Sequence, residues 1–139
     1  STFGERRHDN NIITYTIRSL LNNERPKYGN LEQIWDFLYV GEVVRAIRLI
    51  GEKGKTGTIY GIGSGVYKPL RAYIEKIRDI IDPRLELGIG EVPALSSKTS
   101  SSCVNIDDLK RDTGFEPKVT FEEGIIKTID YLKKYEGDK

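Results

Sequence analysis

The feature that most constrains this fold is a nearly unbroken apolar segment, residues 34–40, with a helical repeat directly after it. Aromatic and branched side chains fill the segment, and such side chains favour a β-strand. Both faces of this strand are apolar and only Asp36 interrupts them, so we expect other elements to cover it from both sides. The repeat that follows predicts a helix closed by Gly51. Its apolar positions are Val43, Val44, Ile47 and Ile50.

Helices and short strands alternate along the rest of the chain. A capping box of Thr120 and Glu123 opens the last helix, and Pro69 suits the first turn of an earlier one. This alternation predicts a single α/β domain of α+β character over residues 1–139, with a small sheet and about five helices. The further helices are expected at residues 9–23, 69–81, 105–112 and after 120, and the further strands at residues 58–62 and 85–89.

Composition excludes several classes of protein. The chain has 22 basic and 21 acidic residues and a net charge of +1, which is not the positive excess that nucleic-acid binding needs. It contains no secretory signal and no apolar run as long as a membrane span. Cys103 is the only cysteine, which excludes an internal disulfide and fits a reducing cytoplasm. Because methionine is absent, we expect a processed or engineered piece of a longer protein.

Two glycine clusters bear on nucleotide binding. Gly51, Gly54 and Gly57 satisfy GxxGxxG, but they follow a helix and precede a strand, whereas a dinucleotide turn follows a strand and opens a helix. We therefore interpret them as a plain loop. Residues 61–65, Gly-Ile-Gly-Ser-Gly, have the correct order for a backbone that approaches a ligand, and a tight turn explains them equally well. The serine-rich residues 94–103 predict a flexible loop.

Several stretches resemble the second half of the extended short-chain dehydrogenase/reductase family, the NAD-dependent sugar-nucleotide epimerases and dehydratases. Residues 27–37 are similar to that family's Val-Tyr-Gly-Asp-Gly-x-Gln-x-Arg-Asp-Phe, and residues 61–65 to its Asn-Ile-Gly-Ser-Gly. Residues 109–125 are similar to its closing motif, which ends in Gly-Phe-x-Pro-x-x-x-Phe-Glu-Glu-Gly-Ile. The resemblance implies the C-terminal, substrate-binding lobe of such an enzyme, without the Rossmann core.

The resemblance also implies a function for the parent enzyme. That enzyme would bind NAD or NADP and a nucleoside-diphosphate sugar, and would epimerise, dehydrate or reduce the sugar. The family's Tyr-x-x-x-Lys pair belongs before Ser1, and we interpret the match at Tyr135 and Lys139 as accidental because it lies on a frayed terminus. We expect no catalytic or cofactor-binding residue in this chain, no bound cofactor and no turnover from it alone. Lacking its Rossmann domain, the lobe is expected to expose apolar surface and to self-associate.

By the same resemblance the sugar nucleotide would contact Asn11, Tyr28, Trp35 and Gly61. Trp35 stands where the family places a diphosphate-binding Arg, and its ring can either stack on a base or sugar or belong to the core. Gly61 replaces the family's ligand-binding Asn. The Asn11 amide can bind a ligand or cap the first helix. The departures at Trp35, at Gly61 and in the loop around Lys98 leave a second hypothesis open, a non-enzymatic protein-interaction module on the same scaffold. His8 has no partners at metal-ligand spacing, so no metal site is expected.

Overall fold

The computed structural model describes residues 1–7, 10–93, 101 and 103–136. His8, Lys139 and most of the loop predicted at residues 94–103 lie outside this part of the chain. The described part contains five helices and a few two-residue strands, which confirms the expected mixture of helices with a small sheet. None of these described helices could span a membrane. The elements are β1 (Thr2–Phe3), α1 (Ile12–Leu21), β2 (Ile34–Trp35), β3 (Leu38–Tyr39), α2 (Val40–Lys53), β4 (Lys68–Pro69), α3 (Leu70–Ile81), α4 (Asp107–Thr113) and α5 (Phe121–Glu136).

Local residues set three helix ends. The Asn11 side chain caps α1 by accepting hydrogen bonds from the backbone N–H groups of the first turn. At α5 the hydroxyl of Thr120 accepts from the Glu123 N–H at 3.2 Å, and the Glu123 carboxylate accepts from the Thr120 N–H at 2.9 Å. The predicted capping box is thereby confirmed. Helix α4 ends at Gly114, whose φ of 70° lies in the left-handed region.

Two helix boundaries differ from the prediction. Helix α2 continues through Gly51 to Lys53, and the N–H of Gly54 donates to the carbonyl of Ile50 at 2.8 Å. A Cβ added at Gly51 would meet no atom within 4 Å, so this glycine lies on an open face, where it costs the helix only about 1 kcal/mol relative to alanine. Pro69 is the residue immediately before α3 and is not part of its first turn.

The strands are shorter than predicted and pair in two separate ladders. The apolar segment 34–40 divides at Asp36 into β2 and β3. β3 pairs with β1 in parallel, and β2 pairs with β4 in antiparallel orientation. The predictions of strands at residues 58–62 and 85–89 are wrong, because neither segment has a partner strand in the described part. The first segment packs against residues 104–105, and the second makes one bridge, between Gly88 and Lys27.

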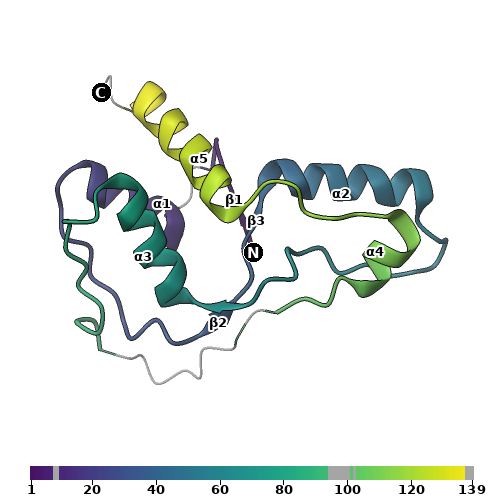
Figure 1. The fold of residues 1–139 in the computed structure, drawn as a ribbon, viewed down its shortest axis with the longest axis horizontal. Coiled ribbons are helices and arrows are strands. Elements are labelled where there is room, and N and C mark those ends of the chain that lie inside the picture. Colours follow the sequence, from purple (N-terminus) through teal and green to yellow (C-terminus); the bar gives the residue numbers. More distant parts are fainter. Residues whose placement is uncertain (8–9, 94–100, 102, 137–139) are drawn as a thin grey trace.

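Buried side chains form two hydrophobic clusters toward opposite ends of the molecule (Figure 1). The large cluster involves α1, α3 and α5, and the small cluster lies between α2 and α4. Phe37 belongs to the large cluster and its neighbour Leu38 to the small one, because successive residues of an extended chain face opposite sides. The small cluster consists of Leu38, Ala46, Ile106, Leu109 and Phe115.

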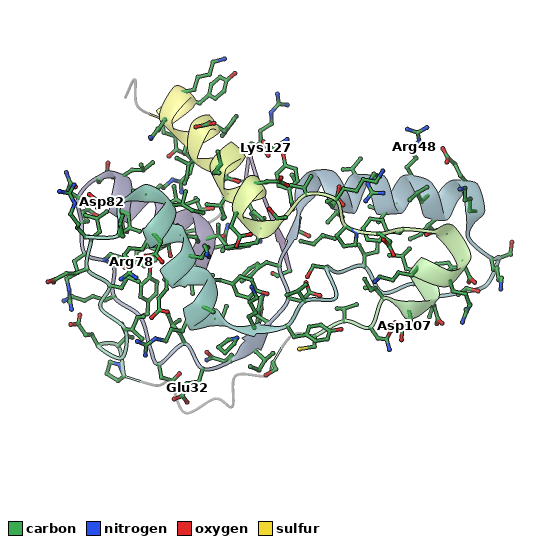
Figure 2. The ribbon with its side chains drawn as sticks, in the orientation of Figure 1. Glu32, Arg48, Arg78, Asp82, Asp107 and Lys127 are labelled. Carbon is green, nitrogen blue, oxygen red and sulfur yellow. The ribbon has the colours of Figure 1, made fainter. Side chains whose placement is uncertain are left out.

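One face of α2 remains apolar and exposed. Val44 is 62% exposed and Ile47 is 57% exposed. Arg48 projects from the same helix on the side away from α4 (Figure 2), and it lies one turn after Val44 on the same face. Val44 and Ile47 thus expose apolar surface on α2, whereas Leu38, where such surface was also expected, is buried in the small cluster.

Candidate functional site

The carboxylate of Asp36 organises the turn at residues 63–65. Asp36 is fully buried, and its Oδ1 accepts from the hydroxyl of Ser64 at 2.6 Å and from the Ser64 N–H at 2.9 Å. Its Oδ2 accepts from the Gly65 N–H at 3.1 Å. A Cβ added at Gly63 would lie 2.6 Å from the same oxygen, so the turn requires glycine there. Of the two interpretations of residues 61–65, these hydrogen bonds favour the tight turn, because its donors are directed at an internal carboxylate.

Trp35 lies at the edge of the large cluster, beside a lysine. The β2–β4 ladder pairs it with Lys68, and directly paired residues of an antiparallel ladder share one face. The ring centroid of Trp35 is 6.4 Å from that of Phe37, and the Trp35 carbonyl accepts from the hydroxyl of Tyr73 at 3.1 Å. The side chain is only partly buried, so it both packs on the core and presents a surface to solvent.

Asn11 and Tyr28 make contacts within the fold. Oδ1 of Asn11 accepts from the N–H groups of Ile13 and Thr14 at 3.0 and 3.1 Å, which is the capping arrangement. Tyr28 is 5% exposed, and its hydroxyl lies 2.6 Å from Oγ1 of Thr16 in α1. Burial raises the pKa of Tyr28 to about 12. The structure therefore turns the Tyr28 hydroxyl toward α1.

Gly61 packs against the segment that leads into α4. A Cβ added at this position would lie 2.6 Å from Cγ1 of Val104 and 2.7 Å from the carbonyl oxygen of Asn105. Any larger residue would have to displace this backbone. The glycine that stands where the resembling family has Asn thus has a packing reason.

The four residues expected to bind substrate lie in three surroundings. Asn11 and Tyr28 contact α1, Trp35 lies in the β2–β4 ladder, and Gly61 faces the segment before α4. Across the described ranges of the chain, no group of three or more His, Cys, Asp or Glu side chains is placed to hold a metal ion. Trp35 is the member of the set with an aromatic surface open to a ligand.

Sequence reasoning missed two features of residues 27–37. Leu31 is 5% exposed and has a φ of 56°, a conformation that strains most residues other than glycine. The resembling family's motif has Gly at this position, and that difference could have revealed the strain. Oε1 of Gln33 is buried without a hydrogen-bond partner in the described part of the chain, which depends on tertiary packing that no local pattern encodes.

Comparison with known sequences identifies relatives of this chain. Residues 1–63 match the NAD dependent epimerase/dehydratase family. A dTDP-glucose 4,6-dehydratase of Xanthomonas campestris pv. campestris is 28% identical over 141 residues, which cover 94% of this chain and 40% of that protein. This chain therefore spans well under half the length of that curated relative.

Solved structures share the fold. The UDP-glucose 4-epimerase of Thermotoga maritima, solved with UDP-glucose, is similar with a TM-score of 0.85 and 26% identity, covering 96% of this chain and 44% of that one. The dTDP-glucose 4,6-dehydratase of Bacillus anthracis, solved with NAD, is similar with a TM-score of 0.84 and 23% identity, covering 99% of this chain and 43% of that one. The resemblance and the fold class expected from the sequence are both confirmed.

Proposed function

We propose, on the premise that this chain belongs to the NAD-dependent epimerase/dehydratase family, that it forms the sugar-nucleotide lobe of a longer enzyme. One observation carries the proposal: 96% of the chain matches 44% of a UDP-glucose 4-epimerase in fold as well as in sequence. The longer enzyme would epimerise, dehydrate or reduce a nucleoside-diphosphate sugar with NAD or NADP as its redox partner. We further propose that it acts in the cytoplasm.

The described residues do not fit a dinucleotide cofactor. Gly51 and Gly54 lie at the C-terminal end of α2, where the helix dipole disfavours phosphate. The N–H groups of Ser64 and Gly65 are directed at the carboxylate of Asp36, which is itself negative. We therefore assign the cofactor to a Rossmann domain in the longer enzyme and expect this chain alone to be catalytically silent.

Trp35 is the residue we assign to the nucleotide. Its partly exposed ring offers a stacking surface to a base or sugar, which an Arg at this position would not provide in the same way. Asn11 would act by fixing the start of α1, since its side chain caps that helix. Gly61 would act by letting residues 104–105 approach closely, and Tyr28 by supporting α1 from within the fold.

Fluorescence tests this assignment directly, because Trp35 is the only tryptophan of the chain. UDP-glucose or dTDP-glucose should change its emission in this chain. Stacking of a base on an aromatic ring contributes about 1–3 kcal/mol, so Trp35→Ala should weaken calorimetric binding roughly 5- to 150-fold. Tyr135→Ala, at an exposed aromatic on α5, serves as the control. If neither this chain nor the longer enzyme bound UDP-glucose or dTDP-glucose, the proposal would be refuted.

A protein-interaction role is the second candidate, and the exposed face of α2 favours it. Val44 and Ile47 form an apolar surface that a partner or a second copy of this chain can cover. Sedimentation velocity should then show concentration-dependent self-association that Val44→Glu removes and Arg48→Gln leaves intact. A monomer at every concentration would contradict self-association. Nucleotide-sugar binding by neither this chain nor the longer enzyme would favour the interaction role over the enzymatic one.

A further inference from the structure

A cavity of about 300 Å³ lies where the two hydrophobic clusters meet. Phe37, Tyr73 and Phe121 line it from the large cluster, and Leu38 lines it from the small one. Residues 117–122, which connect α4 to α5, form another wall. None of the four residues assigned to the sugar nucleotide lines this cavity. This volume is at the lower end of the range of small-ligand sites, roughly 300–1,000 Å³.

The aromatic wall suits a flat ring. The ring centroid of Phe121 lies 4.8 Å from that of Tyr73 and 6.1 Å from that of Phe37. Phe37 and Tyr73 meet edge to face, with centroids 4.9 Å apart and planes at 85°. Phe37 and Tyr73 are almost fully buried, so the partly exposed Phe121 supplies the aromatic surface of this wall. A further aromatic ring can pack on it in an offset or edge-to-face arrangement.

The charged part of the cavity is positive. Lys68 of β4 and Lys118 of the α4–α5 connection both line it with exposed side chains, and neither is in an ion pair within 4 Å in the described part of the chain. The Lys118 charge also interacts with the buried carboxylate of Glu42, so Lys68 is the less compensated of the two. Glu122 is the carboxylate among the lining residues, and Lys76 lies 3.9 Å from it. An anionic group near the two lysines would be complementary to this arrangement, since a lysine ammonium binds carboxylate or phosphate oxygens.

We propose that this cavity binds a small planar aromatic anion. Its ring would pack on the partly exposed ring of Phe121, where that ring meets Phe37 and Tyr73, and its negative group would lie near Lys68 and Lys118. The proposal is independent of the sugar-nucleotide assignment, because it uses other residues and needs no cofactor. Since the ligand would contact both clusters at once, binding should also raise the thermal stability of the chain.

Chemical-shift mapping by ¹H–¹⁵N NMR on the 139-residue chain tests the proposal, with 2-naphthoate as the probe. The amides of residues 64–68 and 118–122 should shift. The uncharged 2-naphthalenemethanol should bind about tenfold more weakly, because two lysine contacts are lost and each exposed ion pair is worth up to about fivefold in affinity. Lys68→Gln and Lys118→Gln should each weaken naphthoate binding about threefold, whereas Lys53→Gln on α2 should not.

A cavity-filling variant keeps the proposal falsifiable if the lysines contribute little. Val66 lines the cavity and is 49% exposed. Its hydrogen bonds to Ser64 and Tyr73 are made by its backbone and do not depend on its side chain. Val66→Trp should therefore fold, fill the cavity and abolish naphthoate binding. Any of three results would overturn the proposal. They are equal affinity for 2-naphthoate and 2-naphthalenemethanol, chemical-shift changes centred on α2, and naphthoate binding that survives in Val66→Trp. Displacement of naphthoate by UDP-glucose would also overturn it, because the cavity would then be part of the sugar-nucleotide site.

Discussion

Asp36→Ala should destabilise this protein more than any surface change, because the carboxylate holds together an entire turn. The substitution removes the acceptor of three donors: the N–H and hydroxyl of Ser64 and the N–H of Gly65. A buried donor left unsatisfied costs about 1–3 kcal/mol. Because Gly65 is exposed and water can reach its N–H, we take the lower part of that range, which gives a loss of about 3–4 kcal/mol in the free energy of unfolding.

Asp36→Asn removes the negative charge and keeps the shape of the side chain. The amide keeps one oxygen for Ser64, but it turns its NH₂ group toward the Gly65 N–H, so the expected loss is about 1–3 kcal/mol. Asp79→Asn is the matched control, because the Asp79 side chain is 48% exposed and pairs with its neighbour Arg78. Urea denaturation at neutral pH should leave this control within about 0.5 kcal/mol of the unmodified chain. If Asp36→Ala proved as stable as the control, the role assigned to this carboxylate would be incorrect.

Three further outcomes are expected. Leu31→Gly relieves backbone strain of about 1–2 kcal/mol, but it removes a buried side chain worth about 1.5–3 kcal/mol and makes the unfolded chain more flexible. Urea denaturation should therefore show a net loss of about 1 kcal/mol in the free energy of unfolding. Glu42→Gln should lower stability by about 2–4 kcal/mol, because the buried carboxylate binds the Arg45 guanidinium at 2.7 Å, and a thermal melt unchanged from that of the unmodified chain would contradict this. Burial raises the pKa of Tyr28, Tyr39 and Tyr73 to about 12, so the unfolded chain loses these protons first and stability should fall between about pH 10 and 12. Tyr28→Phe should make this fall less steep, and equal slopes would refute it.

The helices were predictable because their signals are local. Thr120 and Glu123 are three residues apart and bond to each other, so the sequence alone identifies the start of α5. Strands depend on partners that are distant in sequence. Residues 58–62 have the composition of a strand, but they pass beside residues 104–105 without forming a ladder in the described part of the chain. The strand predicted from composition at residues 58–62 is therefore wrong, because composition does not identify a pairing partner.

The candidate site was predictable in its location and less so in its contacts. The sequence marked Asp36 as the single polar interruption of an apolar strand and marked residues 61–65 as a turn, but no local rule indicates that the two bind each other. The two interpretations of Asn11 could be separated only by its hydrogen bonds, which favour the cap. The departure at Gly61 became explicable once the position of Val104 was known.

The division of buried side chains between two clusters has a consequence for how the molecule opens. The small cluster contains far fewer buried side chains than the large one, and α2 and α4 depend on it. Sub-global unfolding should release those helices before α1, α3 and α5 lose protection, so native-state hydrogen exchange should resolve two free-energy levels. Leu38 and Phe37 mark the boundary, since the peptide bond between them joins a cooperative unit that opens early to one that opens with the whole protein.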